Sequence, residues 1–103
     1  MKTIQERAHA GECLGELGII DLHGHLGETG FAIAENNAKM LVHEMDKIGV
    51  NTIVVSHMQC LGATPELGNE DLWRNIAPFG QRILGYASFW PTKKQDVKER
   101  AEA

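Results

Sequence analysis

Two histidines separated by one glycine, His23 and His25, are the residues of this chain whose types and spacing point most directly to chemistry. They lie in the stretch "IIDLHGHLGETG", where an apolar run gives way to polar residues and glycines. Residues two apart on a strand share a face, so both imidazoles can converge on one divalent cation. Gly24 places no side chain on the opposite face, and the later glycines let the backbone turn sharply. The pattern predicts a metal site, with a pair of hydrogen-bonded loop histidines as the alternative.

Three further residues can serve such a site. Asp21 precedes His23 by two residues, so we expect it on the same face, either orienting a metal-bound imidazole or bonding the neighbouring backbone. His57 ends a second apolar run, and we interpret it as a substrate-facing or structural histidine in preference to a ligand. Together with Cys60, however, it can complete a tetrahedral site around the first two histidines. Otherwise Cys60 is expected to be inert, and no catalytic residue is predicted among these 103 residues.

The first half of the chain reads as strand, helix and strand. Residues 17–22 are almost continuously apolar, which predicts a strand covered on both faces. Apolar residues then recur at helical spacing, in a helix that Asn36 can cap and Gly49 can end. The β-branched residues 53–55 predict a second buried strand.

The second half continues the alternation. Asn69 can cap a short helix whose Trp73 we expect in the core and which ends at Pro78. Residues 82–90 read as a third strand, and Thr92 begins a third helix with capping-box spacing. Such alternation builds parallel sheets, so the predicted class is α/β, in one domain over residues 1–103 with a leader over 1–17.

Composition excludes several classes of protein. Ten Lys and Arg against fourteen Asp and Glu give a net charge of −4 with no large basic cluster, so we expect no nucleic-acid partner. No segment is apolar for long enough to span a membrane, and charged residues interrupt the N-terminus where a signal peptide would be apolar. Two cysteines, far apart in the sequence, fit a reducing compartment. We therefore expect a cytoplasmic protein.

Several segments together resemble the metal-dependent hydrolases of the amidohydrolase superfamily, in the branch of the aminocarboxymuconate-semialdehyde decarboxylase-like proteins. The likeness is carried by "IIDLHGHLG", "MLVHEMDKIGVNTIVVS" and "GNEDLWRNIAPFGQRILGYASFWP", in this order and spacing, and covers roughly residues 18–98. The resemblance implies a TIM (β/α)8 barrel in which His23 and His25 bind a divalent metal, zinc first, with iron or manganese as alternatives. It implies hydrolysis of an amide, ester or lactone, or decarboxylation of a small carboxylic acid.

The resemblance covers only part of such an enzyme. The family takes further histidines from the fifth and sixth strands and an aspartate from the eighth, and a whole barrel needs about 250 residues. The chain therefore corresponds to about three of eight βα units, the N-terminal part of a hydrolase, and we expect it to be inactive alone. The exposed sheet edges of such a fragment favour self-association.

Two other functions fit the same residues. The polymerase-and-histidinol-phosphatase phosphoesterases also begin with a DLHxH strand and place a histidine after the second strand, where His57 lies. Their usual Asp-Gly after the motif is replaced here by Glu28 and Thr29. The second alternative is a non-catalytic binding or dimerising module in which His23, His25, His57 and Cys60 hold a structural zinc.

Overall fold

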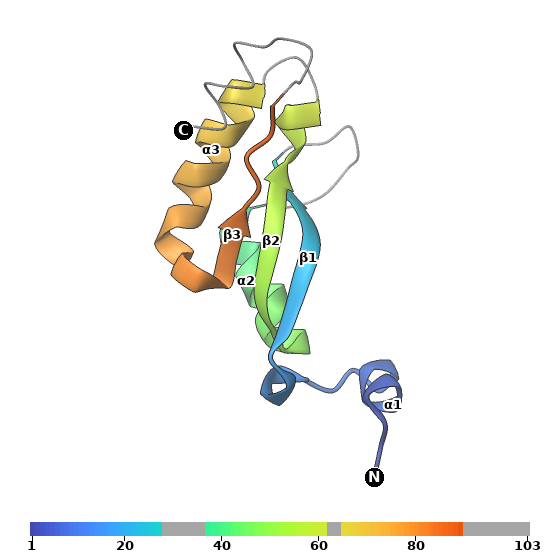
Figure 1. Cartoon of the computed structure of the whole chain (residues 1–103). Helices are drawn as coiled ribbons and strands as arrows, with labels where there is room; N and C mark the ends of the chain where they lie inside the picture. The colour runs from blue at the N-terminus through green and yellow to red at the C-terminus, as the bar shows by residue number, and fades with distance from the viewer. Residues whose placement is uncertain (28–36, 62–64, 90–103) are drawn as a thin grey trace.

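The chain folds as an α/β protein with a three-stranded parallel sheet, as the alternation predicts. The computed structural model describes residues 1–27, 37–61 and 65–89. The helices and strands, in chain order, are α1 (Ile4–His9), β1 (Ile19–Leu26), α2 (Ala38–Ile48), β2 (Val50–His57), α3 (Pro65–Ile76) and β3 (Ile83–Gly85). Short 3-10 helices lie at η1 (Gly15–Leu17), η2 (Met58–Leu61) and η3 (Ala77–Arg82). The strands lie side by side in the order β1-β2-β3 (Figure 1).

Helices α2 and α3 bury one face of the sheet. In Figure 1 α2 lies behind the strands and α3 lies beside β3. Because alternate residues of a strand point to opposite faces, Ile53 and Val55 of β2 face the helices while their neighbours do not. The core consists of Leu26, Ala38, Met45, Ile53, Val55, Leu72, Ile76 and Ile83. The three strands and the helices α2 and α3 therefore all contribute to a single apolar cluster.

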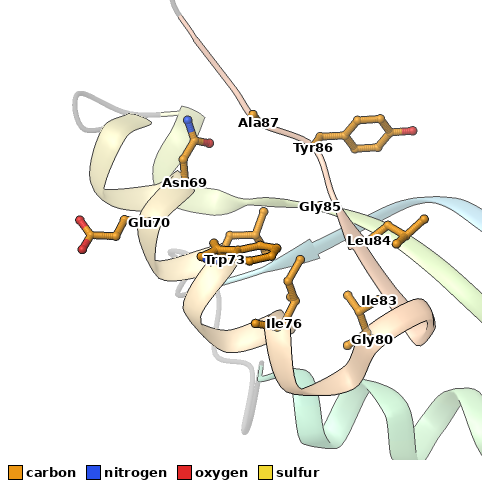
Figure 2. A pocket seen from close by; sticks show the side chains of 12 residues that line it. Asn69, Glu70, Trp73, Ile76, Gly80, Ile83, Leu84, Gly85, Tyr86 and Ala87 are labelled. Atoms are coloured by element: carbon orange, nitrogen blue, oxygen red, sulfur yellow. The ribbon is translucent and has the colours of Figure 1, made fainter. Parts of the chain in front are cut away.

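The opposite face of the sheet is open and partly apolar. Thr52, Val54 and Ser56 of β2 are half-buried there. Leu84 and Tyr86 follow on the β3 side with 44% and 47% of their surface exposed, and Figure 2 shows both side chains pointing away from α3. The Tyr86 hydroxyl donates across this face to the carbonyl oxygen of Leu22, at 3.2 Å.

The helix boundaries differ from the sequence prediction in two places. Asn37, and not Asn36, caps α2, since its side-chain oxygen accepts from the backbone N–H of Met40 at 2.9 Å. Gly49 ends this helix in a left-handed conformation, as predicted. The prediction that Asn69 caps the next helix is wrong, because α3 begins four residues earlier, at Pro65. Proline is well suited to the first turn of a helix, where its missing N–H leaves no bond unmade.

Predictions of burial were wrong for β1 and for Trp73. Ile20 and Leu22 are 60% and 65% exposed, because β1 borders only β2 among the described strands and lies largely beyond the helices. Trp73 is 70% exposed on α3, whereas Leu72 and Ile76 of the same helix lie in the core. Strand β3 ends at Gly85, and the helix predicted from Thr92 lies outside the described residues.

Ion pairs of Lys2 and Arg7 attach the N-terminal helix α1 to the residues that follow it. Arg7 forms ion pairs with Glu12, at 3.2 Å, and with Glu16, and its guanidinium also donates to the carbonyl oxygen of Cys13 at 3.1 Å. The hydrogen bond from Arg7 holds the pKa of Glu16 below its ordinary value of 4.5. Ion pairs thus join residues of the predicted leader to one another.

We expect this attachment to weaken in acid. A carboxylate with a lowered pKa stabilises the folded arrangement above its ordinary pKa, and the contribution is lost as the pH falls through the folded value. Amide hydrogen-exchange protection at Ala10 and Glu12, whose N–H groups close α1, should therefore fall below about pH 4.5. Glu16→Gln should remove most of this pH dependence. Unchanged exchange protection of both amides below about pH 4.5 would contradict the role of Glu16.

Candidate metal centre

His23 and His25 lie together near the carboxyl end of β1, with their side chains exposed. Their Nε2 atoms are 3.0 Å apart, and the rings meet edge to face, with centroids 4.9 Å apart. Two nitrogens that bind one zinc ion at about 2.1 Å lie about 3.0 Å apart at a right angle and about 3.4 Å apart at the tetrahedral angle. The separation of 3.0 Å thus fits two ligands of one cation, and it equally fits the alternative expected from the sequence, a hydrogen bond between the two rings.

Ser56 fixes the ring of His25. It pairs with His25 in the β1–β2 register, and its Oγ lies 3.1 Å from the Nδ1 atom of that ring. We assign the proton to Nδ1, which donates to the hydroxyl and leaves the Nε2 lone pair directed at His23. A second hydrogen bond of this kind orients metal-bound imidazoles in proteins. Sequence reasoning missed Ser56, although its place at the end of β2, opposite the histidine motif, is a usable signal.

Asp21 orients the backbone of the motif and not a ring. Its Oδ1 accepts from the backbone N–H of His23 at 3.0 Å, the second of the two roles expected for it. The β1–β2 register is irregular between Asp21 and Gly24, so two residues of β1 face one of β2. Alternation is broken at this point, and Asp21 pairs with the helix-facing Ile53 whereas His25 pairs with Ser56.

His57 lies on the helix-covered face of the sheet, and both of its ring nitrogens are engaged. Its Nδ1 accepts from the backbone N–H of Gln59 at 3.1 Å, so the proton is assigned to Nε2. That Nε2–H donates to Oδ2 of Asp71 on α3, at 2.6 Å. The residue is only 3% exposed. The arrangement is that of a structural histidine and leaves no nitrogen for a cation.

The four-residue tetrahedral site is wrong for the described residues. Cys60 is buried against α3, and its thiol donates to Oδ1 of Asn69, at 3.3 Å, and to the carbonyl oxygen of Pro65. Within residues 1–27, 37–61 and 65–89, no group of three or more His, Cys, Asp or Glu side chains is arranged to hold a metal ion. In this part of the chain His23 and His25 are thus a pair without a third such side chain beside them.

Two hollows border α3. A polar one of about 730 Å³ is lined by Gly27, His57, Gln59, Leu67, Glu70, Asp71 and Arg74. An apolar groove of about 670 Å³ runs between α3 and β3, with Trp73, Ile76 and Ile83 along it (Figure 2). Neither hollow is lined by His23 or His25.

The fold and site define an α/β protein with a parallel sheet and an exposed two-histidine pair at a strand end. Comparison with protein-family models, curated proteins and solved structures finds no match for this chain. Among the described residues, no helix is long and apolar enough to cross a membrane. Functional inference therefore depends on the residues and their geometry.

Proposed function

We propose that this chain is the N-terminal part of a metal-dependent hydrolase or decarboxylase of the amidohydrolase type, in which His23 and His25 bind a divalent cation. The observation that carries the proposal is the 3.0 Å separation of their Nε2 atoms, with Ser56 bonded to the far nitrogen of one ring. These are the distances and the supporting contact that a metal-binding imidazole pair needs. Zinc is the first candidate, with iron and manganese as alternatives.

The arrangement of the sheet fits the first units of a barrel. The strands follow chain order, and residues of both connecting helices enter a core on one face of the sheet. One half of a doubly wound sheet has the same strand order and the same one-sided helices, so the proposal of a barrel depends on the histidine motif at the end of β1. In this proposal the open face of Val54, Leu84 and Tyr86 is the barrel interior, covered by later strands.

The residues of this chain have defined parts in the proposed site. A cation held there would polarise a substrate carbonyl or activate a water molecule. His25 is held by Ser56, and the backbone of His23 by Asp21, so the two nitrogens are oriented before any ligand arrives. Both histidines lie at the carboxyl end of β1, the end at which barrel enzymes bind small molecules.

The geometry favours this function over the phosphoesterase alternative. That alternative uses a histidine after the second strand as part of a metal cluster, but the nitrogens of His57 are bonded to Asp71 and to the Gln59 backbone. The partner proposed here is accordingly a small carbonyl or carboxylic substrate. We also propose that the protein resides in the cytoplasm, where free thiols such as Cys13 and Cys60 persist.

The test is a calorimetric titration of the purified 103-residue chain with Zn²⁺. We expect one ion per chain, binding lost in the double variant His23→Ala/His25→Ala, and affinity lowered about tenfold in Ser56→Ala. His43→Ala, which removes an exposed histidine of α2, is the matched control and should bind as the parent does. Equal affinity in the parent and the double variant would refute the proposal.

A further inference from the structure

We infer that His57 is a positioning residue for His23 and His25. Through the ring of His57, helix α3 holds the backbone turn at Gly27 that follows β1. The inference rests on the proposed function and names a means by which α3 regulates that site. His57 is buried and has no free nitrogen, so its influence must pass through what its ring contacts. Those contacts lead to Gly27 on one side and to Asp71 on the other.

The ring of His57 lies directly against the backbone of Gly27. A Cβ built on Gly27 would overlap Cε1 of the ring and lie 2.8 Å from both of its nitrogens. Gly27 has a φ of 94°, a left-handed conformation that favours glycine, and it follows His25 by two residues. The imidazole therefore fills the space beneath the turn that ends the metal-binding strand.

Two hydrogen bonds prevent this ring from moving away. Gln59 holds Nδ1 from the start of η2, and Asp71 holds Nε2 from the middle of α3. The 2.6 Å bond to the Asp71 carboxylate is short, and bonds to ionised acceptors are the stronger class. The position of α3 is thus transmitted through one side chain to the backbone at Gly27.

Neighbouring residues of β2 act on the two sides of the motif. Ser56 points to the open face, and its hydroxyl bonds the ring of His25. His57 points to the helices, and its ring supports the backbone at Gly27, two residues after His25. Leu26, which pairs with His57 in the register, is 3% exposed in the core. The end of β2 therefore fixes both the side chain of His25 and the backbone that follows it.

Substitutions at Asp71 separate positioning from general stability. Asp71→Asn keeps an oxygen that accepts from His57 and should bind Zn²⁺ within about twofold of the parent. Asp71→Leu leaves the buried Nε2–H without its acceptor and should weaken binding about tenfold, the size of effect typical of groups that orient metal ligands. Arg74→Ala, which changes the same polar hollow without touching His57, should bind as the parent does.

Asn69→Ala is the control for a purely structural role. Its amide joins α3 to the backbone of Ser88 with bonds of 2.7 and 2.9 Å, and its Oδ1 also accepts from the thiol of Cys60 at 3.3 Å. We expect a loss of unfolding free energy comparable to that in Asp71→Leu, with unchanged zinc affinity. If affinity falls in proportion to stability in both variants, His57 has no positioning role.

A metal-free measurement keeps this inference distinct from the proposed function. Amide hydrogen exchange at Leu26 and Gly27 should accelerate at least about fivefold in Asp71→Leu and stay at the parent rate in Asp71→Asn and Asn69→Ala. Parent-like exchange in all three variants overturns the positioning role, whether or not zinc binds. Accelerated exchange in Asp71→Leu, together with a parent chain that binds no zinc, would refute the proposed metal site and leave the link from α3 to the turn in place.

Discussion

Replacing Gly49 with alanine should lower the free energy of unfolding by about 4 kcal/mol, a large part of the stability of a small domain. Gly49 ends α2 with a φ of 88°, and a left-handed alanine costs about 1 kcal/mol. Its Cβ would also overlap the backbone nitrogens of Leu14 and Gly15 and lie 2.6 Å from the carbonyl carbon of Leu14. Overpacking against three ordered backbone atoms adds about 3 kcal/mol, the upper end of the usual range. Urea denaturation measures the sum.

Gly18 is the matched control for this substitution. Its φ is 67°, but a Cβ there would meet nothing within 4 Å. Gly18→Ala should therefore cost only the conformational part, about 1 kcal/mol. The backbone near Gly49 cannot easily withdraw, because the N–H of Leu14 donates to the carbonyl oxygen of Ile48 at 3.0 Å. Equal losses in the two variants would show that the contact with residues 14 and 15 has no energetic weight.

Gly27→Ala should be the next most damaging change, with a loss of about 3 kcal/mol. The substitution combines left-handed strain with overlap of the His57 ring, which its two hydrogen bonds hold in place. A double-mutant cycle with His57→Ala isolates the contact. Without the ring, Gly27→Ala should cost only about 1 kcal/mol, so the two substitutions should couple by about 2 kcal/mol.

Additive effects would contradict this account of the turn. The measurement is the free energy of unfolding of the parent, both single variants and the double variant in urea. His57→Ala itself leaves the Asp71 carboxylate and the Gln59 N–H without their partner, so it should also destabilise the chain. The double-mutant cycle cancels the cost of losing these hydrogen bonds. What remains is the coupling free energy between positions 27 and 57.

Periodicity predicted the parallel α/β order well because β1, α2, β2, α3 and β3 each contribute apolar residues to one core. Periodicity cannot show which strand lies at an edge, and β1 was therefore predicted to be buried on both faces although Ile20 and Leu22 are exposed. Trp73 was assigned to the core by its size and helical spacing. Leu72 and Ile76 are four residues apart and share the core face of α3, whereas Trp73 lies about 100° further round the helix from Leu72 and stays exposed.

The site was predictable where it depends on residues close in sequence. The two-residue spacing of His23 and His25 predicted a shared face, and their Nε2 atoms meet at 3.0 Å. Asp21 has the same spacing from His23, yet an irregular register intervenes, which no alternation pattern reveals. The contacts of Ser56 and His57 depend on strand pairing and on α3, and these long-range relations are absent from a single sequence.

The order of the strands also bears on how the protein can form during synthesis. Because the sheet runs β1-β2-β3 in chain order, each new strand leaving the ribosome meets the edge formed just before it. Strand pairing then joins segments that are near in sequence, and loop closure stays short at every step. Folding can therefore proceed vectorially, with β2 docking on β1 and the histidine pair already placed before β3 is made.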